Sequence, residues 1–100
     1  MKYGLSAEII NQLQTVFQGY ADIESVYMFG SRAAGTFRDG SDIDLAVIAP
    51  AMTDSTFTAL WNEVDALPLV FKVDCIHFEQ LENKALKKKI LEHGVQFYPA

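Results

Sequence analysis

The sequence is poor in cysteine and in basic residues, and each scarcity excludes a class of protein. Cys75 is the only cysteine, which rules out a disulfide within the chain and a zinc site built from several cysteines. Eight Lys and Arg against thirteen Asp and Glu give a formal net charge of −5. Because neutralisation of phosphates by Lys and Arg supplies most of the affinity for duplex nucleic acid, we expect no direct binding of duplex DNA.

Long apolar runs are also missing. No stretch approaches the roughly 20 apolar residues that a membrane-spanning helix needs, and the first residues lack the basic and then apolar pattern of a signal peptide. We therefore expect a cytoplasmic protein without membrane contact. One hundred residues, half of them hydrophobic, suffice for one domain with its own core. No repeat or linker divides them, so we predict a single domain over residues 1–100.

What the sequence does contain is a stretch in which two apolar runs enclose a glycine-containing turn and two aspartates. Residues 26–29 form the first run, and Asp42 and Asp44 open the second, residues 45–48. Side chains two positions apart on a strand share a face at a spacing of about 6.6 Å. Asp42 and Asp44 therefore point to one place, and their hard oxygen atoms suit Mg²⁺ or Mn²⁺ better than zinc.

A third aspartate, Asp74, lies inside a later apolar run, residues 70–76. It points away from the face of its neighbours Val73 and Cys75, and a buried carboxylate without a partner is costly. A metal shared with the first two aspartates would compensate all three. Such a cluster can hold two ions about 3.5–4 Å apart, which clamp the attacking and leaving oxygens in phosphoryl transfer. The simpler interpretation pairs Asp74 with Lys72 or makes it a loop cap.

The turn ahead of the aspartates offers donors to phosphate. Gly30 lets the backbone approach closely, Ser31 offers a hydroxyl and an amide, and Arg32 offers a fork of charged donors. We place Ser41 in the same nucleotide-binding set. A Gly-Ser turn followed by a capping Asp is common, but its occurrence ten residues ahead of an Asp-x-Asp pair between two apolar runs favours the functional interpretation.

Gly30-Ser31, ten residues and Asp42-Ile43-Asp44 together resemble the signature of the DNA polymerase β-type nucleotidyltransferase superfamily. The local sequences Phe-Gly-Ser-Arg-Ala and Ser-Asp-Ile-Asp-Leu are similar to those of the minimal nucleotidyltransferase (MNT) family within this superfamily. The resemblance implies that the Gly-Ser pair grips a nucleoside triphosphate. It also implies that the paired aspartates bind two Mg²⁺ ions, or Mn²⁺ in their place, and that Asp74 completes the catalytic and metal site. Ala34 departs from the pattern, because a second Arg is often found there.

The same resemblance implies a metal-dependent nucleotidyltransferase that moves an NMP, AMP from ATP, to an acceptor hydroxyl. The implied partner is a helical HEPN toxin with a tyrosine as acceptor, and the chain would be the antitoxin of a toxin-antitoxin pair. Since one small domain leaves no room for an acceptor domain, we expect the partner to supply acceptor recognition. The other hypothesis is a non-catalytic nucleotide-binding antitoxin or regulatory subunit that acts by contact. Whether the chain forms a homo-oligomer stays open.

Apolar residues at helical spacing predict three helices around these runs. We expect them to span Ser6 to Gly19, residues 53 or 54 to Pro68, and Leu81 or Asn83 to His93. The order helix, strand, turn, strand, helix, strand, helix predicts an α/β fold, a small mixed sheet with helices packed on it, with the first two strands antiparallel. The resemblance implies that this is the polymerase β-like nucleotidyltransferase fold.

Some residues receive structural interpretations. We expect Trp61 in the core, Cys75 as a small buried thiol, and His77 as an ordinary surface or half-buried residue. Residues 95–98 could add an edge strand. The lysines of the last helix form either a solvated face or a docking surface for an acidic partner; they are Lys84, Lys87, Lys88 and Lys89.

Overall fold

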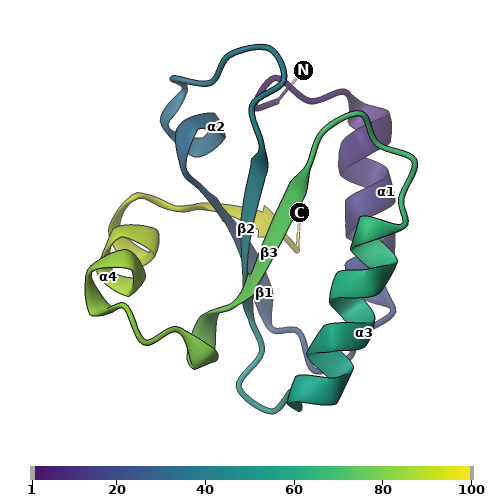
Figure 1. Ribbon diagram of the computed structural model, residues 1–100, viewed down its shortest axis with the longest axis vertical. Helices are drawn as coiled ribbons and strands as arrows, with labels where there is room; N and C mark the ends of the chain where they lie inside the picture. Colours follow the sequence, from purple (N-terminus) through teal and green to yellow (C-terminus); the bar gives the residue numbers. More distant parts are fainter. Residues whose placement is uncertain (1, 100) are drawn as a thin grey trace.

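The computed structural model describes residues 2–99. It shows a four-stranded mixed sheet with helices on both faces (Figure 1). The helices are α1 (Ala7–Gln18), α2 (Ser31–Ala34), α3 (Asp54–Asp65) and α4 (Lys84–His93), with a short 3-10 turn, η1 (Phe78–Gln80). The strands are β1 (Ser25–Phe29), β2 (Ile43–Ile48), β3 (Val73–His77) and β4 (Val95–Tyr98). The predicted small mixed sheet covered by helices is confirmed.

The strands lie in the order β3-β2-β1-β4. β1 pairs antiparallel with both β2 and β4, whereas β2 and β3 are parallel. The antiparallel pairing of the first two strands is as expected, because the link that contains α2 is too short for a full crossover. A parallel neighbour requires such a crossover, and α3 supplies it between β2 and β3. The tail at residues 95–98 adds the edge strand β4.

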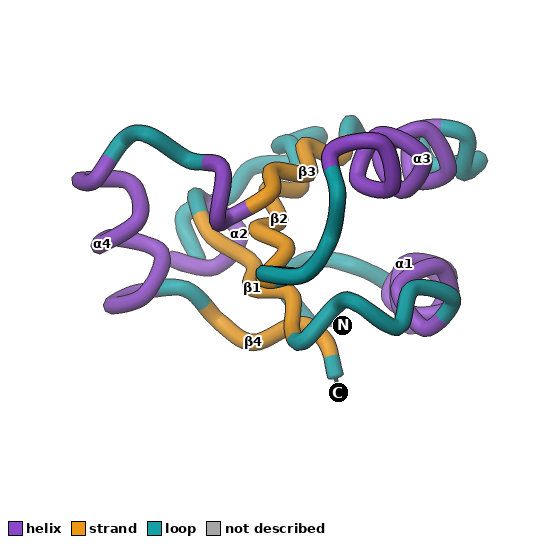
Figure 2. The backbone as a smooth tube through the Cα atoms, turned by 90° about the horizontal axis from the view of Figure 1, so that it is seen from below, coloured by secondary structure: helices purple, strands orange, loops and turns teal. Residues whose placement is uncertain are grey.

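One face of the sheet carries the core and is covered by α1 and α3, which lie together on the same side in Figures 1 and 2. Alternate residues of β1 and β2 point into it, among them Met28 and Leu45, both fully buried. Phe17 of α1 packs edge-on against Phe97 of β4, with 6.3 Å between the ring centroids. The other face carries the intervening residues of the strands, and α2 and α4 lie on its side.

Local signals define where the three longer helices begin. The side chains of Ser6, Thr53 and Asn83 each accept a hydrogen bond from a backbone N–H in the first turn of α1, α3 and α4. These caps satisfy donors that a helix start leaves free. β3 begins at Val73, later than the predicted start at residue 70, and Val70 is 91% exposed in the preceding loop. No helix within residues 2–99 is long and apolar enough to cross a bilayer.

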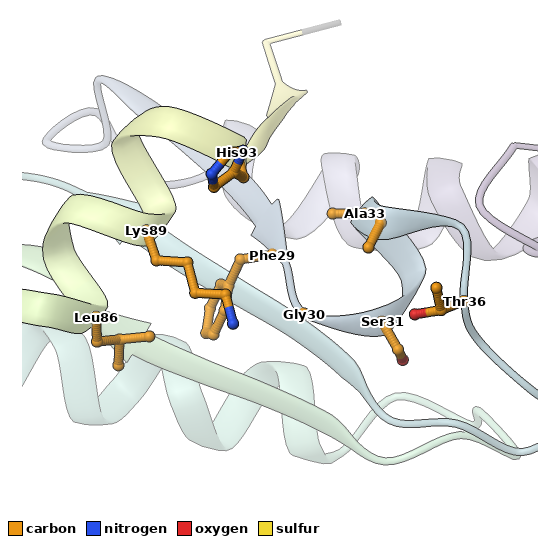
Figure 3. Close-up of a pocket in the computed structure, with 9 residues that line it drawn as sticks. Phe29, Gly30, Ser31, Ala33, Thr36, Leu86, Lys89 and His93 are labelled. Carbon is orange, nitrogen blue, oxygen red and sulfur yellow. The ribbon is translucent and has the colours of Figure 1, made fainter.

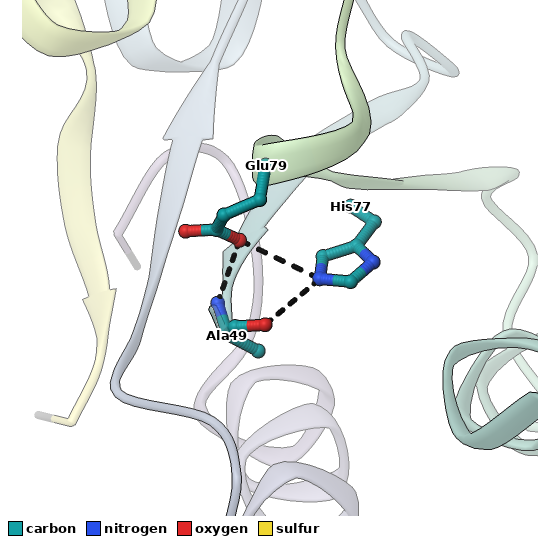
Figure 4. Close-up of polar contacts among 3 residues, drawn as sticks. All are labelled: Ala49, His77 and Glu79. Atoms are coloured by element: carbon teal, nitrogen blue, oxygen red, sulfur yellow. Dashed lines mark hydrogen bonds and ion pairs between the residues drawn. The ribbon is translucent and has the colours of Figure 1, made fainter. Parts of the chain in front are cut away.

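His77 at the end of β3 is buried, so the expectation of a surface or half-buried residue is wrong. Its Nε2 hydrogen-bonds with the carbonyl oxygen of Ala49 at 2.9 Å and lies 3.5 Å from Glu79 Oε1 (Figure 4). The same Glu79 oxygen accepts the N–H of Ala49 at 3.0 Å. The ring also stacks on Phe57 of α3 at 5.1 Å. His77 therefore joins the end of β2, the start of η1 and α3, contacts that its sequence neighbours do not reveal.

Cys75 is buried as expected, and burial, followed by repulsion from Asp74, raises the pKa of its thiol to about 12. Trp61 does not meet its expectation, since 40% of it is exposed. Leu60 and Val64 carry the buried stripe of α3 instead. Position 61 lies about 100° around the helix from position 60, which turns the indole to the margin of the stripe.

Replacing Leu60 by Ala should lower the free energy of unfolding by about 2–5 kcal/mol, because a fully buried leucine leaves a cavity behind. Trp61→Ala is the matched control, and it should cost only about 1 kcal/mol because the indole is partly in water. Urea unfolding followed by circular dichroism measures both. Equal losses at the two positions would contradict this assignment of the buried stripe.

Candidate functional site

Two aspartates lie side by side on neighbouring strands. In the parallel pairing of β2 with β3, Asp44 is directly opposite Asp74. Asp42 comes two residues earlier, just before β2, on the same side of the chain. Asp44 is half-buried, and the other two are exposed to solvent. The structure therefore places the three predicted carboxylates at the same end of the sheet face opposite α1 and α3, with Asp44 and Asp74 directly opposite each other.

The electrostatics of this end are unfavourable without a cation. The pKa of the Asp44 carboxyl is raised, first by burial, then by repulsion from Asp74 and from Asp42, and Lys72 offsets this only in part. Within residues 2–99, no three His, Cys, Asp or Glu side chains gather closely enough to form a ready-made metal cluster. The aspartates are thus repelling neighbours. Their hard oxygen donors and uncompensated charge fit a divalent cation such as Mg²⁺.

Gly30 is fixed by its contact with Asp44. Its φ of 78° lies in the left-handed region, and a Cβ added to it would lie 2.5 Å from Asp44 Oδ2. Both its conformation and its neighbour therefore require glycine. The register explains the proximity, because Phe29, the residue before it, pairs with Asp44 across β1 and β2. The main chain of the turn consequently passes directly beside the carboxylate.

Ser31, the first residue of α2, lines a pocket of about 710 Å³ between the turn and α4 (Figure 3). Ser31 and Thr36 contribute hydroxyls on one side. Lys89 and His93 of α4 lie on the other side. The remaining lining is mostly apolar and is made by Phe29, Gly30, Ala33, Ala34 and Leu86. Gly30 and Ser31, predicted to bind nucleotide, are thus in this pocket, and Gly30 connects it to Asp44.

Arg32 does not point to the place that we predicted for it. It is only 3% exposed, and its Nη1 donates to the carbonyl oxygen of Tyr3 at 2.9 Å. Nε and Nη2 both donate to the carbonyl oxygen of Ser41, at 3.1 and 2.8 Å. The guanidinium also lies over the rings of Phe71 and Phe37, 4.6 and 5.2 Å from their centroids. Arg32 is therefore a buried tie between loops, and we correct its assignment to phosphate binding.

Ser41 holds the loop before the aspartates. Its hydroxyl accepts the N–H of Arg38 at 2.8 Å, and its own N–H donates to the carbonyl oxygen of Arg38 at 3.0 Å. Together with the bonds from Arg32, these contacts fix the loop that delivers Asp42 to the start of β2. Ser41 is not among the residues that line the pocket beside Gly30. Its structural part is to position the loop.

Lys89 and His93 are pocket residues that the sequence reasoning missed. A signal was available, because Lys89 and His93 lie three and seven residues after Leu86, on the side of α4 that Leu86 and the buried Ile90 turn toward the sheet. A count of the lysines on this helix does not separate Lys89 from the other three. The side on which a lysine of α4 lies decides whether it faces solvent or the pocket.

A sequence profile of the family described as "Polymerase beta, Nucleotidyltransferase" matches residues 11–100. No curated protein sequence matches the chain significantly. Among solved structures, the chain is similar to a toxin-antitoxin complex crystallised with AMP-PNP, at 22% identity and a TM-score of 0.72. That match covers 91% of this chain and 73% of the other.

Two further structures share the fold. One is the toxin-antitoxin MntA-HepT, at 18% identity and a TM-score of 0.68, covering 95% of this chain and 74% of that one. The other is the tri-AMPylated Shewanella oneidensis HEPN toxin in complex with MNT antitoxin, at 19% identity and a TM-score of 0.67, covering 93% and 71%. These structures show the shared fold, and the profile match over residues 11–100 establishes that the chain belongs to the polymerase β nucleotidyltransferase family.

Proposed function

We propose that this protein transfers AMP from ATP to a hydroxyl group of a partner protein, with Asp42, Asp44 and Asp74 as the catalytic and metal-binding residues. The observation that carries the proposal is the register of β2 and β3, which pairs Asp44 with Asp74 beside the backbone of Gly30. Phosphoryl transfer needs charge neutralisation and positioning more than any other contribution. A pair of repelling carboxylates beside a phosphate-accessible turn supplies the place for both.

The three aspartates would hold two Mg²⁺ ions, or Mn²⁺ in their place. The bound ions would supply charge to the phosphate oxygens and relieve the repulsion that, after burial, raises the pKa of Asp44. Gly30 and Ser31 would bind the phosphates that leave. Ser41 keeps its predicted nucleotide-binding role only through the loop that it holds, since its hydroxyl already accepts the N–H of Arg38.

In the proposed step, the acceptor oxygen forms a bond to the α-phosphorus of ATP while the bond from that phosphorus to the bridging oxygen breaks. Pyrophosphate leaves, and the acceptor proton passes to the carboxylate of Asp74. Asp74 suits this role because it is exposed at the outer strand of the sheet, where an acceptor can approach, whereas Asp44 is half-buried.

The acceptor in this proposal is a tyrosine of a HEPN toxin, and the chain is the cytoplasmic antitoxin that silences it. Support comes from the similar structures, one described as a tri-AMPylated HEPN toxin in complex with MNT antitoxin and another as a toxin-antitoxin with AMP-PNP. The proposal applies those descriptions to this chain on the basis of shared family and fold. An exposed Asp74 agrees with an acceptor brought by another protein.

A second function, neutralisation of the partner by contact alone, is favoured by one feature of the turn. Arg32 is buried and bonded to backbone carbonyls, and Ala34 carries no charge. Residues 31–35 therefore present no cationic side chain to a triphosphate. In this second function, the acidic end of the sheet binds a nucleotide or a metal without turnover.

Replacing Asp42 and Asp44 by Asn separates the two functions. If the protein is a transferase, AMP addition to a co-purified HEPN partner should fall at least about 100-fold, since even outer-shell partners of metal ligands are worth about 10- to 100-fold. Intact-mass measurement after incubation with ATP and Mg²⁺ detects the added AMP, and a growth assay with the toxin reports neutralisation. Asp65→Asn, an exposed change at the end of α3, is the control.

Loss of neutralisation with an intact complex would support catalysis. Neutralisation that survives the double substitution would support the contact function. A wild-type protein that adds no AMP to its partner or to any other acceptor, and that binds no ATP, would contradict the transferase proposal.

Asp44→Asn should also raise the melting temperature of the metal-free protein at pH 7. The pKa of Asp44 is raised on folding, so the ionised form destabilises the fold above that pKa. The gain should disappear below the ordinary value of 3.8, where the carboxyl is protonated in both folded and unfolded chains. Thermal scans in EDTA from pH 3 to 8 test this. A substitution that lowers the melting temperature at pH 7 would contradict the assigned repulsion.

Gly30→Ala should abolish ATP binding, because the added methyl group would occupy the space beside Asp44 Oδ2. Gly35→Ala is the matched control, since Gly35 has the same φ of 78° but no atom within 4 Å of an added Cβ. Gly35→Ala should lose about 1–2 kcal/mol of stability from its left-handed backbone. Gly30→Ala should lose more, because its ψ of −155° lies in a region that only glycine adopts readily and because the added methyl group meets Asp44. Titration with AMP-PNP should find binding lost in the first variant only, and equal binding by the two would contradict the assigned contact.

A further inference from the structure

The four lysines of α4 are not equivalent. Lys87 places its Nζ 5.4 Å from the centre of the Phe78 ring. Lys88 is an outward residue, with 76% of its side chain exposed and an ion pair to Glu92 at 3.8 Å. Lys89 alone among these lysines lines the pocket beside Gly30. Lys87 and Lys88 thus make contacts on the surface of α4, whereas Lys89 lies at the pocket.

The packing of α4 explains why Lys89 is turned toward the pocket. Ile90 is fully buried and anchors the helix, while Leu86 lines the pocket three residues before Lys89. Positions three and four apart lie on the same side of a helix. Leu86, Lys89 and His93 therefore form one row, and in Figure 3 the Lys89 side chain extends from α4 into the space between Leu86 and Gly30.

The pocket lining carries a lysine in a protein that is acidic as a whole, and Glu92, which does not line the pocket, lies 3.8 Å from His93. The lining includes one lysine, one histidine and the hydroxyls of Ser31 and Thr36, and it contains no Asp or Glu. No carboxylate within residues 2–99 forms an ion pair with Lys89. In a chain with a net charge of −5, a lysine without a carboxylate partner in this pocket favours an anion there. An ammonium group facing hydroxyls and a glycine backbone suits phosphate oxygens.

We propose that Lys89 binds the terminal phosphates of the nucleoside triphosphate, across the pocket from Gly30 and Ser31. This inference rests on the proposed function and specifies how the triphosphate is held. Gly30 touches both Asp44 and the pocket, so an α-phosphate at the carboxylates directs the β- and γ-phosphates toward Lys89. His93, one turn further along α4, offers a second donor.

A lysine on α4 would also explain how a triphosphate is bound beside a turn whose residues 31–35 carry no free positive charge. Residues 31–35 present no free cation, because Arg32 is buried and Ala34 is uncharged, and the exposed Arg38 does not line the pocket beside Gly30. The positive charge that a triphosphate requires would therefore come from α4, a separate element that packs over β1 on the same face of the sheet. Lys89 is a substrate-binding residue in this proposal and takes no part in the chemical step.

The test compares Lys89→Ala with Lys88→Ala, its immediate neighbour on α4, and with Lys89→Arg, which keeps the charge. Isothermal titration with AMP-PNP and Mg²⁺, with AMP, and with inorganic tripolyphosphate gives three dissociation constants for each protein. Lys89→Ala should weaken AMP-PNP and tripolyphosphate about 10-fold or more, as expected for loss of a charged hydrogen bond, and AMP less than about 2-fold. Lys88→Ala should match wild type, and Lys89→Arg should retain most of the affinity.

Each outcome decides a separate question. AMP-PNP binding by Lys89→Ala equal to that of wild type, or an equal loss in Lys88→Ala, would overturn the inference and leave the proposed function intact. Lys89-dependent binding of tripolyphosphate without binding of AMP-PNP would support the anion site and contradict the nucleotide function. Failure of wild type to bind either compound would overturn both. Circular dichroism should give all variants the wild-type melting temperature, because the substituted side chains are exposed.

Discussion

The structure depends on holding two like charges side by side. Asp44 and Asp74 face each other across a parallel strand pair, and their repulsion opposes the pairing. What keeps them in register is the opposite face of the same strands, where Leu45 is fully buried and Cys75 is 4% exposed. A slip of one residue would turn those apolar side chains to the acidic face and the carboxylates into the core. The hydrophobic core therefore stabilises an arrangement of charges that would not persist alone.

The sequence predicted those parts of the molecule that depend on neighbours along the chain. The caps at Ser6, Thr53 and Asn83 and the shared face of Asp42 and Asp44 are local features, and the structure contains them. The element order also predicted a small mixed sheet with a helix between the second and third strands. The parallel pairing that sets Asp74 directly opposite Asp44 is a finding of the structure.

The failures of prediction have a common physical cause, which is dependence on partners distant in sequence. A guanidinium after a Gly-Ser turn has the same local sequence whether it faces a phosphate or the interior. Arg32 is turned inward by carbonyls at Tyr3 and Ser41 and by two aromatic rings. His77 is likewise buried by contacts with Ala49 and Phe57. Lys89 differs from its neighbouring lysines only through the packing of α4, which charge counts do not contain.

The buried guanidinium of Arg32 has a consequence for how this protein can vary. Its acceptors at positions 3 and 41 are main-chain carbonyls, which every amino acid provides. Substitution of the side chains at those two sites leaves the carbonyl acceptors in place. The hydrogen bonds of Arg32 therefore tolerate sequence changes there as long as the backbone keeps its path. Position 32 has no such freedom, since only arginine combines a flat cation with donors in both directions. The contact with Arg32 therefore constrains the side chain at position 32 and only the backbone at positions 3 and 41, while the Ser41 hydroxyl is retained by its separate bond to Arg38.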